Sequence, residues 1–164
     1  MSSKPAFYYK EAEALGRLLL SKRLTLSTAE SCTGGMIGAA VTSVPGSSEW
    51  FRGGVIAYDN RIKMSLLNVP EAILDEHGSV SAEVVSAMAE GAAEKLNTDC
   101  AIAVSGIAGP DGGTEDKPVG LVFIGVYCKG KVEVFKTIFP GDREQVREQA
   151  VGKSIGYLVD LLTN

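Results

Sequence analysis

The feature that most constrains the fold is an alternation of short β-rich runs with helix-type segments. The β-rich runs cover residues 24–30, 51–58 and 100–109, and segments with helical spacing of apolar residues separate them. Two further β-rich runs follow one another across Lys129 and Gly130, where glycine permits the positive φ angle of a tight hairpin. Alternating strands and helices pair in parallel, whereas a hairpin is antiparallel. The sequence therefore predicts a single α/β domain over residues 1–164 with a mixed sheet.

Capping residues predict where the helices begin and end. The expected helices run from Pro5 to about Ser21, from the glycine turn at 33–35 through Val41, from a cap at Asn60, from Pro70 to Gly78, from Ser81 to Leu96, and from Asp142 to Leu162. The last helix begins with a capping-box pattern, because Gln145 follows Asp142 by three residues.

Composition limits the class of protein and its partners. The 164 residues are 45% hydrophobic and 22% charged, which is ordinary for a globular domain. A net charge of −4 without a basic stripe argues against direct nucleic-acid binding. No apolar run is long enough to cross a bilayer, and the first residues lack the apolar core of a signal peptide. We therefore expect a cytoplasmic protein without a membrane partner.

The cysteines and the histidine restrict the chemistry further. The three cysteines are odd in number and contain no CxxC pair, which argues against a disulfide framework and a zinc site. Two of them, Cys100 and Cys128, fall in β-rich runs and are interpreted as small core residues. The single histidine, His77, excludes a multi-histidine metal site and lies where a helix is expected to end.

The stretch TAESCTGG places two possible nucleophiles, Ser31 and Cys32, at the start of a glycine turn. Gly34 and Gly35 would let an anionic group approach the N–H groups of the following helix, and Thr33 adds a hydroxyl. The same residues also suit an ordinary helix cap with close packing, so the turn alone leaves both interpretations open. If the strand continued through Ser31 and Cys32, their side chains would point to opposite faces and only one would reach a pocket.

A second glycine-rich segment, SGIAGPDGGTEDKPVG, spans residues 105–120 directly after a β-rich run. Ligands of open α/β sheets bind beyond the carboxyl ends of the strands, and glycine-rich backbone can form an anion nest there. A plain connection between a strand and a hairpin needs fewer residues, so we favour a ligand-binding loop over a flexible surface loop.

Lys63 is a candidate base, because a serine nucleophile in a chain with one histidine would most readily pair with lysine. It is expected on the first turn of a helix, where a positive charge is slightly unfavourable, although an exposed lysine in water would explain the position equally well. Arg143 and Arg147 share one face of the last helix and match the geometry of phosphate oxygens. Alternatively, they are solvated charges paired with neighbouring glutamates.

Six ordered motifs resemble the CinA C-terminal domain family, which includes the PncC-type nicotinamide-mononucleotide amidohydrolases. The motifs are TAESCTGG, FRGGVIAYDNRIK, HGSVS, SGIAGPDGG, KPVGLV and GDREQVR, and the resemblance covers roughly residues 10–160. It implies a three-layer α/β/α sandwich with a mixed, mostly parallel sheet of about five strands that includes a C-terminal β-hairpin. It also implies hydrolysis of the carboxamide of nicotinamide mononucleotide to nicotinate mononucleotide and ammonia, without a metal ion or organic cofactor.

The resemblance also implies roles for individual residues. Ser31 would be the nucleophile, Lys63 its base, and Tyr58 would lie beside the pair; the alternative nucleophile, Cys32, stays open from the residues alone. The expected substrate-binding residues are Thr33, Gly34, Gly35, Ser105, Gly106, Gly109, Gly112, Gly113 and Arg147, of which the loop and the arginine would hold the phosphate and ribose. A homodimer is a further implication of the resemblance.

Other functions are compatible with the same sequence. They are a non-catalytic nucleotide-binding module, an accessory protein of DNA uptake, and an amidohydrolase acting on another small amide. Many members of the family carry an additional N-terminal domain with nucleotide pyrophosphatase activity. We do not expect that activity here, because this sequence begins at the C-terminal domain.

Overall fold

The structure, a computed structural model, describes residues 8–164 and is built around a five-stranded sheet with the order β2-β1-β3-β4-β5. The strands are β1 (Leu26–Glu30), β2 (Phe51–Ile56), β3 (Cys100–Gly106), β4 (Leu121–Cys128) and β5 (Lys131–Ile138). The helices are α1 (Tyr9–Lys22), α2 (Met36–Thr42), α3 (Asn60–Leu67), α4 (Glu71–His77), α5 (Ala82–Leu96) and α6 (Arg143–Thr163), with a short 3₁₀ helix η1 (Ser47–Glu49).

The sheet is mixed, as the sequence predicts. β1 pairs in parallel with both β2 and β3, and the later pairs β3–β4 and β4–β5 are antiparallel. Four of the five strands therefore point in one direction and only β4 runs against them. Helical crossovers separate the first three strands, whereas a two-residue turn joins β4 to β5, which accounts for the change of pairing.

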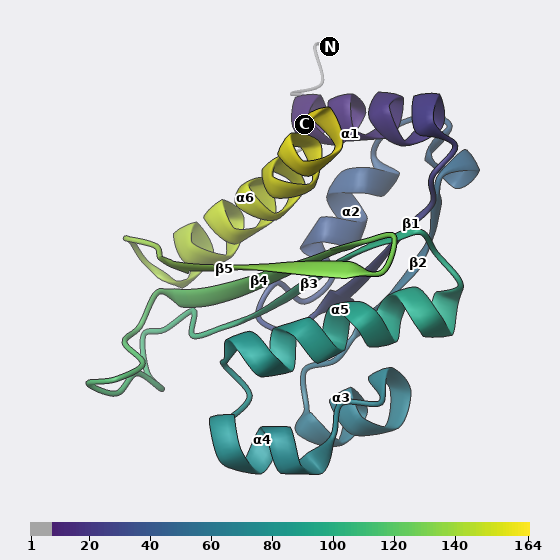
Figure 1. The fold of residues 1–164 in the computed structure, drawn as a ribbon. Helices are drawn as coiled ribbons and strands as arrows, with labels where there is room; N and C mark the ends of the chain where they lie inside the picture. Colours follow the sequence, from purple (N-terminus) through teal and green to yellow (C-terminus); the bar gives the residue numbers. More distant parts are fainter. Residues whose placement is uncertain (1–7) are drawn as a thin grey trace.

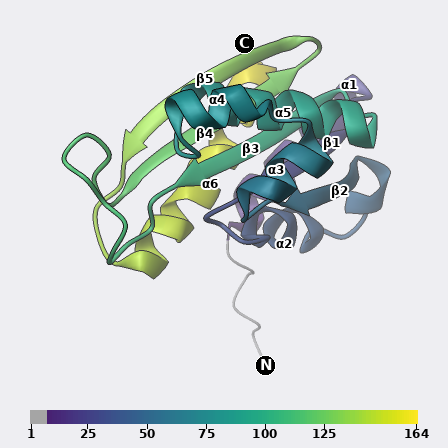
Figure 2. The ribbon, with the colours of Figure 1, turned by 90° about the horizontal axis from the view of Figure 1, so that it is seen from below.

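Helices cover both faces of the sheet, which confirms the three-layer α/β/α architecture. α1, α2 and α6 pack on one face, and α5 packs on the other (Figure 1). α3 and α4 pack against α5 rather than directly on the sheet, so they form an outer shelf on that side (Figure 2). The central strand β3 and its neighbour β1 are buried on both faces; β3 consists mainly of small and apolar residues, whereas β1 also contains Ser27, Thr28 and Glu30.

Most expected boundaries agree with the structure to within a few residues. The start of the first helix at Pro5 lies outside the described residues. The cap of α3 differs from expectation: the preceding Asp59, not Asn60, has the extended backbone of a cap, and its carboxylate accepts from the N–H of Arg61 at 2.8 Å. The capping box of Asp142 and Gln145 is present.

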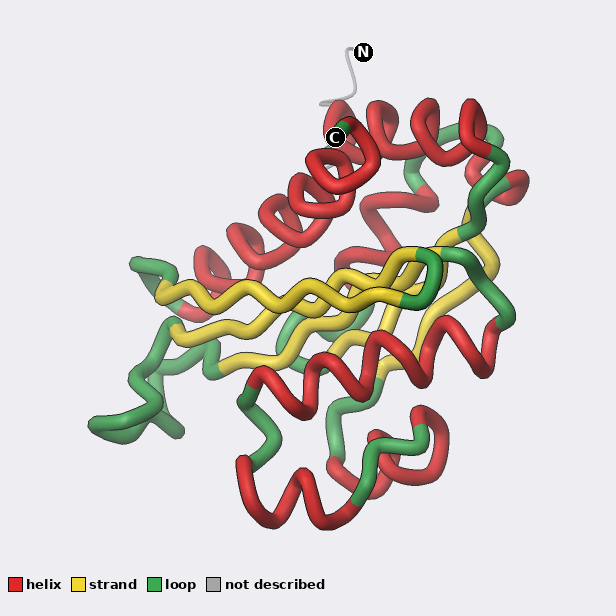
Figure 3. Tube along the Cα trace, in the orientation of Figure 1, coloured by secondary structure: helices red, strands yellow, loops and turns green. Residues whose placement is uncertain are grey.

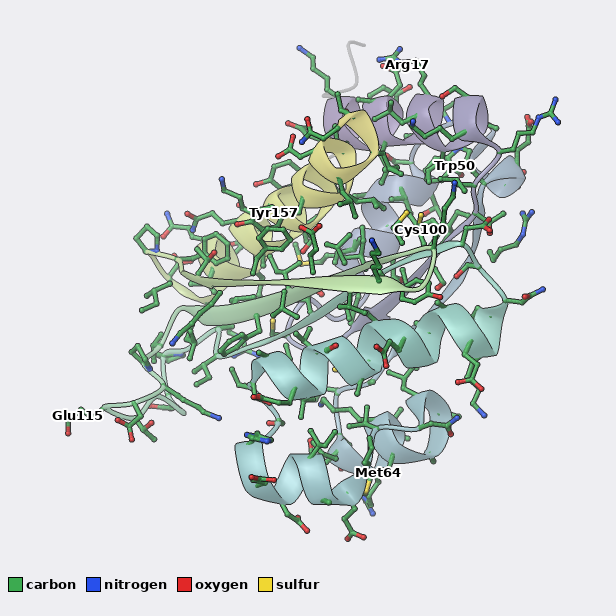
Figure 4. All side chains as sticks on the ribbon, viewed as in Figure 1. Arg17, Trp50, Met64, Cys100, Glu115 and Tyr157 are labelled. Atoms are coloured by element: carbon green, nitrogen blue, oxygen red, sulfur yellow. The ribbon has the colours of Figure 1, made fainter. Side chains whose placement is uncertain are left out.

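Cys100 and Trp50 are both core residues. Cys100 is fully buried, as expected (Figure 4), whereas Cys128, which faces it across β3 and β4 with the two Sγ atoms 3.4 Å apart, is only partly buried against the core. Trp50 is buried beneath α1, where a side chain at Gly16 would meet its ring at 2.8 Å (Figure 4). Close packing at Gly16 therefore seats the aromatic ring in the core.

A glycine in α5 fixes the position of α3. A Cβ atom added at Gly91 would overlap the backbone carbonyl of Leu67, the last residue of α3. Because backbone cannot move aside as a flexible side chain can, α3 can lie this close to α5 only with glycine at this position. α3 carries Lys63, so this contact also sets where that side chain lies.

We therefore expect Gly91→Ala to lower the free energy of unfolding by about 1–3 kcal/mol, since overpacking must displace backbone. Gly156 provides a matched control, because it also lies within a helix and a Cβ there would meet no atom within 4 Å. Gly156→Ala should be neutral or stabilising by up to about 1 kcal/mol. Urea unfolding of both variants measures the difference, and equal stability of the two would contradict the packing argument.

Candidate active site

The candidate site lies where the three parallel strands end. Ser31 directly follows β1, Tyr58 follows β2 by two residues, and Ser105 and Gly106 end β3. The carboxyl ends of parallel strands lie at the same edge of a sheet, and β1 sits between β2 and β3. The chain turns from β1 toward β2 and later returns on the other side of β1, which is the arrangement that opens a ligand crevice in α/β sheets.

A serine and a lysine meet at this edge. The Nζ atom of Lys63 lies 3.4 Å from the Oγ atom of Ser31 and 3.3 Å from the backbone carbonyl oxygen of Tyr58. Lys63 is 1% exposed and Ser31 is 8% exposed, so both belong to the interior although they line a pocket. The interpretation of Lys63 as a solvated surface charge is therefore wrong.

Burial changes the acid–base behaviour of Lys63. Removing the ammonium from water lowers the pKa of Lys63 below its ordinary value, and the opposing effect of Asp59 does not cancel this. A lowered pKa increases the neutral fraction near neutral pH, and only a neutral amine can accept a proton. The Ser31–Lys63 pair therefore has the composition of a nucleophile with its general base.

The pair opens into a pocket that continues into a larger cleft. The pocket has a volume of about 190 Å³ and is lined by Ser31, Cys32, Tyr58, Lys63, Ser79, Val80, Ser105, Gly106, Ala108 and Arg143. The cleft has a volume of about 440 Å³ and is lined by Gly78, Ser79, Val80, Gly106, Ile107, Ala108, Gly109, Asp111, Gly112, Thr114, Lys117 and Arg143. Because five residues line both, the two spaces adjoin.

A buried carboxylate holds the turn that carries Ser31. Glu30 is 2% exposed, and its Oε1 accepts from the Thr33 hydroxyl at 2.6 Å and from the N–H of Ile37 at 2.8 Å. Its Oε2 accepts from the N–H of Gly38 at 3.0 Å. These bonds satisfy the first N–H groups of α2, so an anionic ligand cannot use them in the way the sequence suggested. Periodicity treats Glu30 as the end of a strand and gives no signal for this role.

We expect Glu30→Gln to lower the free energy of unfolding by about 1–3 kcal/mol. The glutamine amide has the shape of the carboxylate but no charge. Its NH₂ group is a donor, so it cannot accept the hydrogen bonds that one carboxylate oxygen accepts in the wild type. Glu49→Gln is the matched control, because Glu49 is exposed. Denaturant unfolding monitored by circular dichroism gives both values, and a Glu30→Gln protein as stable as the control would contradict this role.

Cys32 is poorly placed to replace Ser31 as a nucleophile. It is 5% exposed and packs with the core between the sheet and α2, and burial raises the pKa of its thiol to about 11. The thiolate is the reactive form, so this thiol stays protonated near neutral pH. The sequence predicts that only one of Ser31 and Cys32 faces a pocket if the strand continues through both. β1 instead ends at Glu30, and both residues line the pocket.

Tyr58 lies beside the Ser31–Lys63 pair as expected, whereas Arg147 contacts the protein rather than the open pocket. The backbone carbonyl of Tyr58 accepts from Lys63, the residue is 64% exposed, and its hydroxyl accepts from an Nη atom of Arg143 at 3.4 Å. Arg147 binds the nucleophile turn itself: its Nε donates to the carbonyl of Cys32 at 2.9 Å, and its Nη2 to that of Thr33 at 3.4 Å. Arg143, on the same helix face, reaches the pocket instead.

The glycine-rich loop supplies part of the cleft. Figure 3 shows that the loop between β3 and β4 extends well beyond the sheet, and Glu115 projects near its tip (Figure 4). Of the residues expected to bind substrate, those that line the pocket or the cleft are Ser105, Gly106, Gly109 and Gly112. Those outside both linings are Thr33, Gly34, Gly35, Gly113 and Arg147. Lys117 and Ser79 were not anticipated, although a lysine within a glycine-rich segment is a usable signal for anion binding.

Residues 8–164 contain neither a cluster of metal-ligating side chains nor a membrane-spanning helix. Nowhere in this range do three or more histidine, cysteine, aspartate or glutamate residues gather in a way that would hold a metal ion. None of the helices in the same range has the length and apolar character needed to span a bilayer.

The fold and the buried Ser31–Lys63 pair define an α/β protein with a candidate active site at the carboxyl edge of its sheet. Residues 9–162 match the family model of the CinA C-terminal domain, and the chain belongs to this family. A CinA-like protein of Dictyoglomus turgidum is 50% identical over 82% of this chain and 33% of its own length. A putative competence-damage inducible protein of Clostridium beijerinckii is 54% identical over 84% of this chain and 34% of its own length.

Solved structures of the family have the same fold. A competence/damage inducible protein of Agrobacterium tumefaciens is 34% identical, with a TM-score of 0.93 over 100% of both chains. A CinA superfamily protein of Klebsiella pneumoniae is 33% identical, with a TM-score of 0.92 over 95% of this chain and 98% of its own. The chain spans about a third of the length of the curated relatives, whereas it corresponds to nearly the whole of these solved chains.

Proposed function

We propose that this protein is an amidohydrolase that converts nicotinamide mononucleotide to nicotinate mononucleotide and ammonia by a Ser–Lys mechanism. The observation that carries the proposal is the buried Nζ atom of Lys63 at 3.4 Å from the Oγ atom of Ser31, at the wall of a pocket. A lysine is costly to bury, and here burial yields an amine of lowered pKa beside a hydroxyl. The family resemblance supplies the particular amide.

The first half of the reaction forms an acyl-enzyme. Neutral Lys63 accepts the hydroxyl proton as Ser31 Oγ attacks the carboxamide carbon, which gives a tetrahedral oxyanion. When this intermediate collapses, Lys63 returns the proton to the leaving nitrogen and ammonia departs. An ester of Ser31 remains, and Lys63 is neutral again.

The second half releases the acid. Lys63 accepts a proton from a water molecule that attacks the ester carbon, and it then returns that proton to Ser31 Oγ as the ester bond breaks. The product is a carboxylic acid, which ionises in water. The net reaction consumes one water for each ammonia released and needs no redox partner.

The donor that we assign to the oxyanion is the backbone N–H of Cys32. Hydrolases of the α/β class commonly use the N–H of the residue after the nucleophile. Within residues 8–164, this N–H donates to no oxygen of another residue, whereas the N–H of Gly34 donates to the carbonyl of Ser31. Removing one such donor typically costs about 10²–10³ in rate, so the shape of the turn matters as much as its side chains.

The test is the production of ammonia and nicotinate mononucleotide by the purified protein from nicotinamide mononucleotide, with a chelator present. Equimolar formation of both products by the wild type supports the proposal. Saturable binding without either product would identify a non-catalytic nucleotide-binding module, and turnover of a different amide in a substrate panel would correct the substrate. The homodimer implied by the family stays a prediction, which sedimentation of the same preparation addresses.

A further inference from the structure

The cleft beside the Ser–Lys pocket contains two cationic side chains from different elements. Lys117 comes from the β3–β4 loop, and Arg143 is the first residue of α6. Each is held in place by a backbone carbonyl: Lys117 Nζ donates to His77 O at 2.5 Å, and Arg143 Nη1 donates to Gly109 O at 2.8 Å. Both contacts leave further N–H groups of the same side chains for a ligand.

These cations are not neutralised by the protein. The ion pairs among residues 8–164 involve neither Lys117 nor Arg143. One carboxylate, Asp111, also lines the cleft, so the lining carries two positive charges against one negative charge. A cleft with excess positive charge beside a reactive pair favours a substrate with an anionic group remote from its reacting atom.

The glycine-rich loop adds donors to the same cleft. The N–H groups of Gly109 and Gly112 donate to no acceptor within residues 8–164, and both residues have positive φ angles, of 83° and 89°. Neither glycine has a side chain to keep a ligand away from the backbone, so each N–H can donate to an anionic group in the cleft. The cleft thus combines two fixed cations with unpaired backbone donors.

From this arrangement we propose that Lys117 and Arg143 form the subsite for the phosphate group of a nucleoside monophosphate whose base occupies the Ser31–Lys63 pocket. This inference rests on the proposed function, because it places the reacting amide at Ser31. It differs from the expectation for Arg147, whose guanidinium binds the carbonyls of the nucleophile turn. The subsite makes the enzyme specific for the nucleotide over its dephosphorylated riboside.

The test compares nicotinamide mononucleotide with nicotinamide riboside, which differ only in the phosphate. For each protein, the quantity measured is the ratio of kcat/KM for the nucleotide to kcat/KM for the riboside. We expect Lys117→Gln and Arg143→Gln each to lower this ratio by about 10- to 100-fold, the usual effect of losing a charge-assisted hydrogen bond. Lys95→Gln, on the exposed end of α5, should leave the ratio unchanged.

The Arg147→Ala variant distinguishes the role of Arg147 from that of Arg143. Since it disturbs the turn and not the phosphate, it should lower both kcat/KM values alike and leave the ratio as in the wild type. A ratio unchanged in Lys117→Gln and Arg143→Gln, with the nucleotide still hydrolysed, would overturn the subsite and leave the proposed function standing. A ratio that fell only in Arg147→Ala would return the phosphate to that residue and likewise overturn the subsite.

Calorimetric titration distinguishes failure of the subsite from failure of the proposed function. The same two ligands are titrated into wild type and into the Lys117→Gln and Arg143→Gln variants. If the wild type hydrolyses neither ligand but binds the nucleotide more tightly than the riboside, and the variants lose that preference, the subsite is supported and the hydrolase is not. If the wild type binds neither ligand, the subsite and the proposed function are both overturned.

Discussion

Replacing Ser31 with alanine is expected to reduce ammonia release from nicotinamide mononucleotide by about 10⁴-fold or more, the usual consequence of losing a covalent nucleophile. The fold and the affinity for the nucleotide should persist. Among the described residues, the Ser31 hydroxyl contacts only Lys63 through a side-chain hydrogen bond, and Lys63 keeps the carbonyl of Tyr58 as an acceptor. Single-turnover assays with calorimetric binding measure both quantities in one preparation.

Two control variants make the result specific. Ser48→Ala removes an exposed hydroxyl and should retain full turnover. Cys32→Ala should also retain most of its turnover, because burial raises the pKa of that thiol to about 11. Loss of activity in Cys32→Ala together with full activity in Ser31→Ala would transfer the nucleophilic role to the cysteine and overturn the Ser–Lys mechanism.

Replacing Lys63 with methionine is expected to abolish turnover and, at neutral pH, to stabilise the fold. Methionine has similar length and carries no charge, so it fills the same space without desolvating an ammonium. In the wild type, kcat/KM should rise with pH as Lys63 loses its proton. Because burial lowers the pKa of Lys63, this rise should begin below the ordinary lysine value of 10.5.

The stability difference should depend on pH with a definite sign. Below the lowered pKa, Lys63 is charged in both states, and the folded state bears the full cost of the buried charge. Between the lowered pKa and 10.5, the unfolded state binds more protons, so the stability of the wild type rises with pH. The advantage of Lys63→Met should therefore shrink over that interval and be lost above it.

Urea unfolding from neutral pH to the ordinary lysine pKa measures this difference. Lys95→Met serves as the control, since Lys95 is exposed in the last turn of α5 and should show no comparable pH-dependent gain. A Lys63→Met protein less stable than the wild type at neutral pH would show that the hydrogen bonds of Lys63 outweigh the cost of burying its charge, which contradicts this prediction. A wild-type rate independent of pH would argue against a neutral lysine as the base.

The sequence predicts those parts of the fold that depend on interactions between residues close together in the chain, such as the hairpin turn and the helix caps. The hairpin follows from Lys129 and Gly130, both of which adopt positive φ angles, and the last helix follows from the capping box at Asp142. These signals act within a few residues, so no tertiary information is needed to interpret them. The sequence predicts Asn60 as the cap of α3, whereas the structure has Asp59 in that position. Both residue types suit a cap, and only the backbone conformation at the start of the helix distinguishes them.

The candidate site was accessible from sequence only in part. Ser31 and Lys63 are 32 residues apart, and the single histidine together with the family motifs, not spacing, suggested the pair whose Oγ and Nζ atoms lie 3.4 Å apart. Glu30 gave no signal, since its partners lie three, seven and eight residues later and meet it only when α2 folds back on the end of β1. Arg143 and Arg147 look equivalent in sequence, yet one lines the pocket and the other holds the turn.

The sequence by itself determined the order and type of the elements, the mixed sheet and the family, because periodicity, turn residues and motifs are properties of short stretches of chain. Only the tertiary structure decided which side chains meet, which charges are buried and which cations face the cleft. The burial of Lys63 depends on the packing of α3 against α5 at Gly91, and its pKa follows from that burial. Such contacts join residues far apart in the chain, and packing alone determines them.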